Sequence, residues 1–414
     1  MSRLALNGGD PVRSEPFPQR GHVGAEERAA VDALFDEAIA TGVAPGYNGP
    51  EETAYCEEFS AFLGGGYTDA VSSGTAGVYV ALRALDLEPF GEVIVGAVTD
   101  PGGMMPIPLL NLIPMVADTA PDSYNTDPEQ VAALLSPRTR AIVVPHIGGE
   151  PADIAGIVEL ARSRSIPVIE DCAQAHGATL NGQHVGTFGD IAAFSTMFGK
   201  HHSSGGQGGL VFTRDESRYH MIRRASDRGK PFFLPAGSTN VMASLNLNLN
   251  DLSAAIGRVQ LRKLPGNVKR RRAVVAGLVE ALAEDRCVSI PEPLPGAEPS
   301  YWFLRMRFHA DACSVDKATF CRALIAEGLP VMVDYSAALP HTMDWFVNRR
   351  VFGTGGYPWT SPAYTGDPHG VFPCPNAHAT MATHFNLQIH EAWDDQAVAD
   401  AVAIFEKVGG AFER

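Results

Sequence analysis

The feature that most constrains the fold is a repeat of short apolar runs separated by helical segments. Runs at 92–97, 139–145 and 167–170 are almost continuously apolar, and apolar residues at helical spacing mark 154–163 between the last two. Strands that are apolar on both faces are typical of a parallel sheet covered by helices. The alternation therefore predicts an α/β fold with a mostly parallel central sheet flanked by helices.

Further elements are predicted on either side of this repeat. Helices are expected over 26–40, 51–63, 76–85, 269–282, 315–327 and 395–408, and strands over 70–72, 115–117, 191–194, 210–213, 300–308 and 329–333. The character of the chain changes after Pro265, so we predict a large domain with an N-terminal arm over 1–264 and a smaller α+β domain over 265–414. The segment 335–372 is irregular and rich in aromatic residues, and such a long loop is usually functional.

Composition excludes some classes of function and favours one compartment. The 414 residues carry a net charge of −15, which argues against nucleic acids and anionic membranes as partners. Six cysteines form no CxxC pair, as expected in a reducing cytoplasm. The opening MSRLALNGGDPVRSEPFP has no long apolar run, and no window is apolar enough to span a membrane. We expect a cytoplasmic protein.

One lysine stands at the end of a predicted strand, in the stretch 189–213. Lys200 follows the apolar run 191–194 and precedes four glycines at 205, 206, 208 and 209, which allow close approach of the backbone to a ligand. A lysine fixed in such a loop can lose solvation, drop its pKa and attack a carbonyl. On this stretch alone, a solvated surface loop is equally compatible.

Two other strand ends carry residues that suit a ligand. Ser73, Gly74 and Thr75 join a strand to a helix, where free N–H groups and the helix dipole favour an anion, although one of them could serve only as an N-cap. Asp171 ends a buried strand, where α/β sheets place ligand contacts, although it too could be a capping aspartate. Gln174 and His176 follow at spacings that could face the same ligand.

These three pieces together match the needs of pyridoxal phosphate. Its aldehyde condenses with a lysine, its ring nitrogen stays protonated beside a carboxylate, and its phosphate needs an anion cradle. Lys200, Asp171 and the turn 73–75 supply one group of each kind. None is specific alone, but the combination in this strand context predicts this cofactor.

With these residues in these positions, the chain resembles the DegT–StrS family of sugar and cyclitol aminotransferases, which are fold-type I pyridoxal phosphate enzymes. The resemblance spans essentially the whole chain. Its motifs are SSGTAGVYVALRAL (72–85), VIEDCAQAHGA (168–178), GDIAAFS with Lys200 and GGQGG (189–209), NLNLNDLSAAIGRVQLRKL (246–264) and FPCPNAHATMATHFNLQIH (372–390). The opening LALNGGDPVR resembles the arm of members that act on antibiotic cyclitols.

The resemblance implies roles for the two most specific positions. Lys200 would attach to the cofactor and then move a proton between substrate and cofactor. Asp171 would pair with the pyridinium nitrogen, and Gln174 would touch the O3′ side of the ring.

The remaining roles concern the phosphate. Gly74, Thr75 and Ser195 would hold it within the subunit. Asn246 matches a family asparagine that reaches the phosphate from the neighbouring subunit, which implies a homodimer with shared active sites.

Several positions depart from the family pattern. Asp100 stands in GAVTDPGG where an aromatic side chain usually stacks on the cofactor, so it contacts substrate instead or another side chain covers the ring. Asn248 replaces a common arginine, Gln207 replaces a glutamate in the glycine loop, and His201 and His202 follow the lysine. Because Lys200 and Asp171 are intact, these changes suggest altered substrate recognition.

The resemblance implies an aminotransferase that moves an amino group from L-glutamine or L-glutamate to a keto-sugar or keto-cyclitol, as in the biosynthesis of antibiotics and other secondary metabolites. Two alternatives stay open. A sugar dehydratase of the same fold carries histidine at the lysine position, which Lys200 argues against but His201 keeps in view. A non-catalytic sensor or partner protein is suggested by Asp100, Asn248 and Gln207.

Overall fold

The computed structural model describes residues 3–414, and its centre is a seven-stranded sheet in the order β1-β9-β8-β5-β4-β2-β3. Its strands are β1 (Tyr67–Val71), β2 (Glu92–Gly96), β3 (Ile113–Ala117), β4 (Thr139–Pro145), β5 (Val168–Asp171), β8 (Ile191–Ser195) and β9 (Gly209–Thr213). The pairings from β3 to β8 are parallel, and β9 is antiparallel to both its neighbours. The predicted mostly parallel sheet is confirmed.

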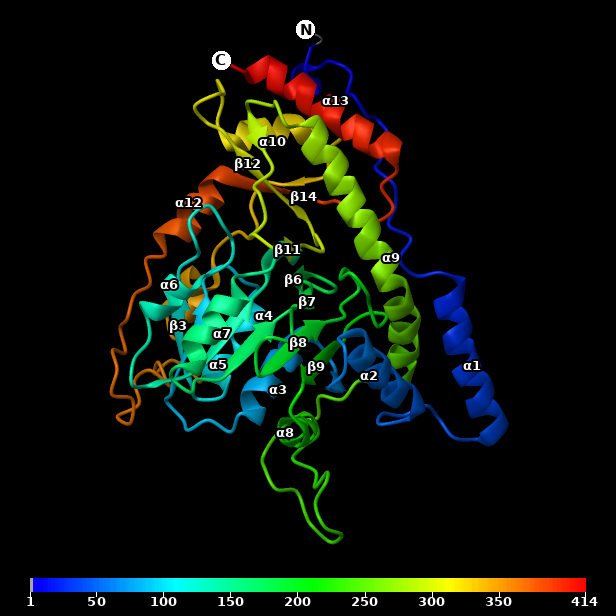
Figure 1. Cartoon of the computed structure of the whole chain (residues 1–414), viewed down its shortest axis with the longest axis vertical. Helices are drawn as coiled ribbons and strands as arrows, with labels where there is room; N and C mark the ends of the chain where they lie inside the picture. The colour runs from blue at the N-terminus through cyan, green and yellow to red at the C-terminus, as the bar shows by residue number, and fades with distance from the viewer. Residues whose placement is uncertain (1–2) are drawn as a thin grey trace.

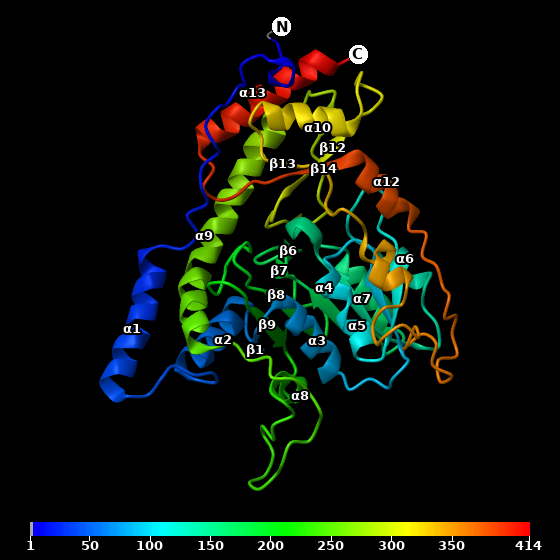
Figure 2. The same ribbon diagram turned by 180° about the vertical axis from the view of Figure 1, so that it is seen from behind.

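Helices cover both faces of this sheet (Figures 1 and 2). One face packs against α3 and α8, and the other against α2, α7 and α9. The helices around the sheet are α1 (Ala25–Thr41), α2 (Pro50–Phe62), α3 (Gly74–Ala84), α4 (Pro101–Met104), α5 (Pro106–Leu109), α6 (Pro128–Ala132), α7 (Ile154–Arg162), α8 (Glu216–Ser226) and α9 (Asp251–Ala281). None of the helices in residues 3–414 is long and apolar enough to cross a membrane.

A second, antiparallel sheet lies above the first in Figure 1 and has a core of its own. It consists of β10 (Val288–Ser289), β12 (Leu304–Phe308), β14 (His384–Leu387) and β13 (Val331–Met332), in that order, and packs against α10 (Lys317–Ala326) and α13 (Asp395–Phe412). A small third sheet joins β11 (Ala297–Glu298) to β6 (Thr179–Leu180) and β7 (Gln183–His184).

The predicted start of the helix over 269–282 is wrong. Instead, α9 runs without a break from Asp251 to Ala281 and contains Pro265. Proline lacks an N–H and usually breaks a helix, but here Leu264 and Val268 are buried on either side of it. Tertiary packing therefore outweighs the local preference. The predicted division at residue 264 falls inside α9, which reaches from the large sheet to the small one (Figure 1).

The strand predicted over 300–308 begins only at Leu304. The preceding residues leave the sheet because their N–H groups bond elsewhere: Ser300 N donates to Gly149 O and Trp302 N to Gly148 O, at 2.9 and 2.8 Å. Tyr301 between them has a φ of 51°. The alternating pattern of SYWFLRMRF therefore includes residues 300–302, which bond to the turn at 148–149 and not to the sheet.

The other predicted elements appear with shifted ends, and the strand predicted over 329–333 shrinks to β13. The segment 335–372 is irregular as predicted, apart from the 3₁₀ turn η3 (Pro340–Thr342) and α11 (Asp344–Val347). Elements that the sequence did not indicate are β6, β7, β10, β11, β14, α4, α5, α6, α8, α11 and α12 (Pro375–Thr383).

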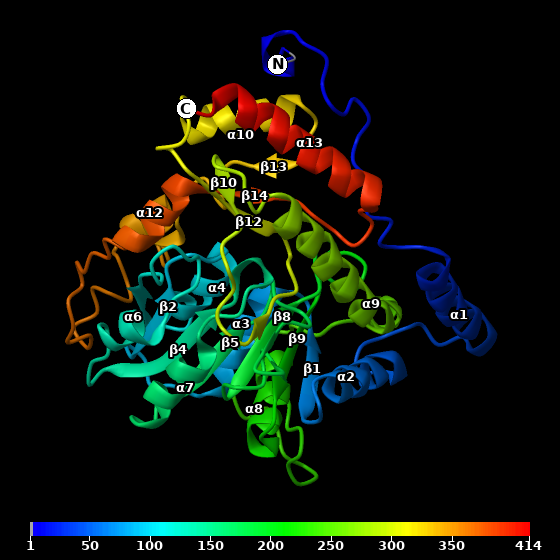
Figure 3. The ribbon, with the colours of Figure 1, turned by 45° about the horizontal axis from the view of Figure 1, so that its top comes forward.

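The N-terminal arm runs past α13 and down the side of α9 to α1 (Figure 3). Around the short turn η1 (Ala5–Asn7), it is anchored by the buried carboxylate of Glu327. Glu327 accepts hydrogen bonds from Ala5 N at 2.8 Å and Val12 N at 2.9 Å, and it pairs with Lys407. The arm is therefore fixed to the small sheet's helices before it reaches the large sheet.

Candidate active site

A cavity of about 220 Å³ lies where β5, β8 and the N-terminus of α3 meet. The carboxyl ends of parallel strands converge at such an edge, which explains why separate sequence segments meet there. Seven of the eight predicted site residues line it: Gly74, Thr75, Asp100, Asp171, Gln174, Ser195 and Lys200.

Lys200 is the basic group of the cavity and is only 7 % exposed. Burial lowers the pKa of Lys200 to about 8, while the carboxylates of Asp171 and Asp100 oppose this shift. A lysine with this pKa is partly neutral near physiological pH, and only the neutral amine attacks a carbonyl. The alternative of a solvated surface lysine is excluded.

Asp171 ends β5 inside the cavity, where burial raises its pKa. Its Oδ1 accepts a hydrogen bond from Ala173 N at 3.1 Å. Its Oδ2 lies toward Gly103, where an added Cβ would approach it to 2.8 Å. A buried carboxylate of this kind gains most from a protonated nitrogen beside it, so the site fits a pyridinium ring.

The N-terminus of α3 forms the anion cradle. Ser73 Oγ accepts a hydrogen bond from Ala76 N at 3.0 Å, so this residue is the N-cap. Gly74 and Thr75 follow in the first turn, where backbone N–H groups have no partner within the helix. A Cβ on Gly74 would lie 2.6 Å from Ser195 Cβ, so only glycine lets the two walls of the cradle approach this closely. The cradle fits a phosphate.

Gln174 is held on both sides of its amide. Its Oε1 accepts a hydrogen bond from Gly148 N at 2.8 Å, and its Nε2 donates to Tyr335 Oη at 2.8 Å. Tyr335 opens the irregular segment 335–372, and burial raises its pKa. No sequence signal pointed to Tyr335, because it lies far along the chain from the motifs that it supports.

The structure corrects the expectation that His176 faces the ligand. His176 is buried behind the cavity, and its Nδ1 lies 2.9 Å from Nδ1 of His202. Nε2 of His202 in turn lies 2.7 Å from the hydroxyl of Tyr55, and His201 stacks on His176. Burial lowers the pKa of all three histidines, so they are neutral rings packed under the lysine loop.

Two departures from the family pattern, Asp100 and Gln207, line the cavity, whereas the departure Asn248 and the family-matching Asn246 lie outside it. Asp100 caps α4 by accepting a hydrogen bond from Gly102 N at 2.8 Å and remains exposed at the rim, and Gln207 also lines the cavity. Asn246 and Asn248 lie outside the cavity of their own chain. Asn246 is exposed and Asn248 is half-buried, and Asn248 Nδ2 donates to Asn246 Oδ1 at 2.6 Å.

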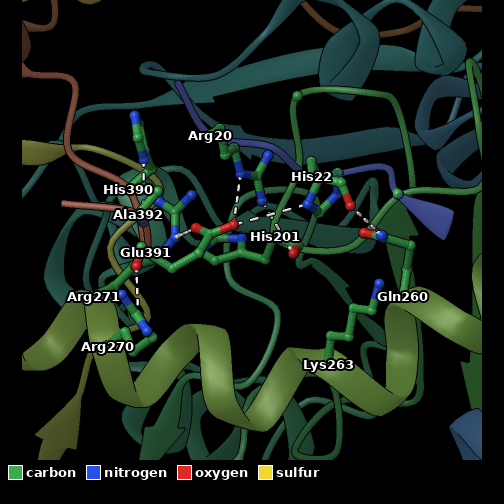
Figure 4. Close-up of polar contacts among 12 residues, drawn as sticks. Arg20, His22, His201, Gln260, Lys263, Arg270, Arg271, His390, Glu391 and Ala392 are labelled. Carbon is green, nitrogen blue, oxygen red and sulfur yellow. Dashed lines mark hydrogen bonds and ion pairs between the residues drawn. The ribbon is translucent and has the colours of Figure 1, made fainter. Parts of the chain in front are cut away.

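A buried ion-pair cluster lies next to the lysine loop (Figure 4). Glu391 bonds to Arg20 Nε through Oε1 and to Arg271 Nε through Oε2, both at 2.8 Å. Arg270 Nε donates to Glu391 O at 2.6 Å, and Arg20 Nη2 donates to His201 O at 3.1 Å. The N-terminal arm, α9 and the segment after β14 therefore converge on the residue that follows Lys200.

The fold and the cavity together define a pyridoxal phosphate-dependent enzyme of fold type I. Residues 26–406 match the DegT/DnrJ/EryC1/StrS aminotransferase family. The chain belongs to this family, and it is an aminotransferase that uses pyridoxal 5′-phosphate, an amino donor and a keto acceptor.

The chain shares moderate sequence identity with known aminotransferases and closely matches solved structures. The L-glutamine:2-deoxy-scyllo-inosose aminotransferase of Micromonospora echinospora is 33 % identical over 295 residues, which cover 68 % of this chain and 69 % of the relative. The structure of an aminotransferase from Psychrobacter cryohalolentis matches with a TM-score of 0.84 and 25 % identity, covering 96 % of this chain and 99 % of that one. A Bacillus subtilis protein, NtdA, solved with bound cofactor PMP, matches with a TM-score of 0.80 and 20 % identity, covering 96 % of this chain and 85 % of that one.

Proposed function

We propose that the enzyme transfers an amino group from L-glutamine or L-glutamate to a keto-cyclitol or keto-sugar in the synthesis of an amino-cyclitol or amino-sugar metabolite. The observation that carries this proposal is the buried Lys200, with its pKa lowered to about 8, in one cavity with Asp171 and an anion cradle. This set suits reversible attachment of a cofactor carbonyl followed by proton transfer.

When bound, pyridoxal phosphate supplies an electrophilic carbonyl and an electron-withdrawing ring. In this proposal, Lys200 Nζ would hold the carbonyl end of the bound cofactor and would also carry the proton that the transfer requires. Asp171 keeps the ring nitrogen protonated. Gln174 orients the ring edge, and the first turn of α3 with Ser195 holds the phosphate, so that the reacting atoms stay in place.

The charges around the cavity favour a neutral polyol as acceptor. Lys200 is the only lysine or arginine among the described residues that line it, whereas Asp100 and Asp171 are acidic. Asp171 faces the cofactor in this proposal, so Asp100 at the rim is the carboxylate left for the acceptor. It would repel a nucleotide diphosphate but can accept hydrogen bonds from hydroxyl groups. The name of the Micromonospora echinospora relative supports the same choice.

We further propose that two copies of the chain share their active sites. Asn246 lies outside its own cavity and its side chain is exposed, which supports a role in the site of a neighbour. On α1, apolar side chains are unusually exposed: Phe35 is 49 % exposed and Ile39 81 %, and Val43 follows at 70 %. Such apolar side chains gain from burial against a second subunit.

The dehydratase alternative is disfavoured by the position of His201. Its Nε2 lies 3.1 Å from Ser300 O, and its ring does not line the cavity. The non-catalytic alternative rests on Asp100, Asn248 and Gln207, none of which removes a group that the proposed chemistry uses.

The absorption spectrum of the purified enzyme tests the proposal, recorded before and after addition of L-glutamine. We expect a visible band from the lysine-bound cofactor that bleaches, with release of up to one equivalent of keto acid per site before any acceptor is added. A keto-cyclitol should then restore the band faster than a nucleotide-linked keto-sugar does. A band that neither bleaches with L-glutamine nor with L-glutamate would contradict the donor, and no band after reconstitution would favour the non-catalytic alternative.

A further inference from the structure

Trp302 contacts the lysine loop in two ways. Its indole Nε1 donates a hydrogen bond to Gly199 O at 2.9 Å, so it holds the peptide that precedes Lys200. The Nζ atom of Lys200 lies 3.6 Å from the centroid of the Trp302 ring. This distance is well within the range in which an ammonium is attracted by the negative face of an indole.

The backbone of Trp302 is fixed independently of the lysine. Trp302 N donates to Gly148 O at 2.8 Å, and Trp302 O accepts a hydrogen bond from Arg271 Nη1 at 3.2 Å. The same Arg271 nitrogen bonds to Tyr301 O at 2.7 Å. Arg271 belongs to the ion-pair cluster around Glu391 (Figure 4), so that cluster also sets the position of the indole.

The indole of Trp302 is one of three groups that can stabilise the charge on Lys200. The carboxylates of Asp171 and Asp100 attract the ammonium, and the buried ring of His176 is neutral. Among the described residues, Lys200 Nζ has no hydrogen-bond or ion-pair partner, so the ring face is its nearest cation-stabilising neighbour. Without it, the flexible lysine side chain could adopt several rotamers in the cavity.

We propose that Trp302 is a positioning residue for Lys200: the indole N–H fixes the loop, and the ring face holds the amine whenever it is not attached to the cofactor. The inference rests on the proposed role of Lys200. A lysine that alternates between attached and free states must be held close to the reacting atoms while it is free, because small displacements lower the reaction rate. The ring face of Trp302 holds it there.

The test follows capture of the cofactor by the cofactor-free enzyme, with pyridoxal phosphate as the probe. The rate is measured by absorbance from pH 6 to pH 10, and borohydride reduction with peptide mapping identifies the modified lysine. Trp302→Leu removes the ring face and the N–H, whereas Trp302→Phe keeps an aromatic face and loses only the N–H. Trp393→Phe is the matched control, because Trp393 packs on Phe17 and its buried Nε1 has no partner among the described residues.

At pH values above that of half-maximal rate (the inflection of the pH profile), we expect Trp302→Leu to slow cofactor capture by roughly 10-fold, because the amine is no longer held in place. The pH of half-maximal rate should fall by about one unit, because the ammonium loses a desolvated cation–π contact. Trp302→Phe should slow capture by about threefold while keeping most of the inflection. Trp393→Phe should match the unmodified enzyme in both.

Two different failures are distinguishable. If the unmodified enzyme captures the probe at Lys200 and both Trp302 variants match it in rate and inflection, the role of Trp302 is overturned and the proposed function stands. If the probe never attaches to Lys200, the proposed function fails and the inference fails with it. Should Trp302→Leu not fold, Trp302→Phe alone decides: an unchanged capture rate overturns the inference.

Discussion

Two neighbouring groups of buried charges differ in how completely they are paired. In the cavity, Lys200 Nζ faces an indole ring and a carboxylate that keeps one oxygen toward Gly103. In the adjacent cluster, both oxygens of Glu391 bond to guanidinium groups, from Arg20 and Arg271. Both groups lie close to the same loop, because Arg20 also bonds to His201 O.

The pKa shifts follow from this difference in pairing. Burial dominates at Lys200 and lowers its pKa to about 8, so the amine becomes available for chemistry. Burial alone would raise the pKa of Glu391, but Arg271 and Arg20 outweigh it and the net shift is downward, so the carboxylate stays charged and structural. Incomplete pairing therefore accompanies the group that we propose to react, and complete pairing accompanies the one that holds segments of the fold together.

The sharpest way to test this comparison is Lys200→Ala. We expect turnover to fall by roughly four orders of magnitude or more, because one group serves both in covalent attachment and in proton transfer. The free energy of unfolding should change little, because no ion pair is broken. Steady-state kinetics and chemical denaturation measure the two effects.

Lys269→Ala provides the matched control, because Lys269 is an exposed lysine on α9. It should leave both turnover and stability unchanged. Substantial turnover in Lys200→Ala would remove Lys200 from the mechanism.

Asp171→Asn should have the second-largest effect on activity. The amide keeps the shape of the side chain but cannot hold the ring nitrogen in its protonated state. We expect turnover to fall by roughly 10²–10³-fold while some cofactor stays bound. Because Asp171 also raises the pKa of Lys200, the pH inflection of cofactor capture should move below its starting value near 8. An unchanged turnover would refute the role of Asp171.

Glu391→Ala should give the opposite pattern, with a large loss of stability. It leaves the buried guanidinium of Arg271 and the partly buried one of Arg20 without their carboxylate, which costs about 3–5 kcal/mol in the free energy of unfolding. Urea denaturation measures this loss. The exposed pair Arg286–Glu413 provides the control, and Glu413→Ala should cost less than about 1 kcal/mol. Equal losses in the two variants would contradict the importance of burial.

The parts of the site that could be predicted from the sequence are those set by their position at the ends of strands. The turn 73–75, Asp171 and Lys200 each stand at a strand end, and parallel strands bring such ends together whatever the details of packing. Their meeting in one cavity is therefore a consequence of the alternating pattern. Their catalytic roles remain predictions.

The parts that were missed depend on contacts between distant segments. Trp302 lies in an alternating stretch that predicted a strand, but its backbone bonds to the turn at 148–149 instead. Tyr335 reaches Gln174 from an irregular segment. Pro265 lies within α9 because packing around it outweighs its local preference, and His176 turned out to face other histidines. No local pattern encodes these contacts.

The last prediction concerns the histidines packed beneath the lysine loop, whose effect on stability is small at neutral pH and grows as the pH falls. His202 has its pKa lowered to about 3 by burial, with the charge of His22 adding to the shift. The folded protein therefore leaves this ring neutral below pH 6.5, whereas the unfolded chain protonates it. Because the unfolded state then binds more protons, stability falls as the pH falls from about 6.5 toward 3.

His202→Gln removes the titrating ring and keeps a polar group near Tyr55. The free energy of unfolding of this variant should fall less steeply with decreasing pH, by about 1.4 kcal/mol per pH unit. Denaturation series at several pH values measure both slopes, and identical slopes would mean that His202 is already protonated in the folded protein.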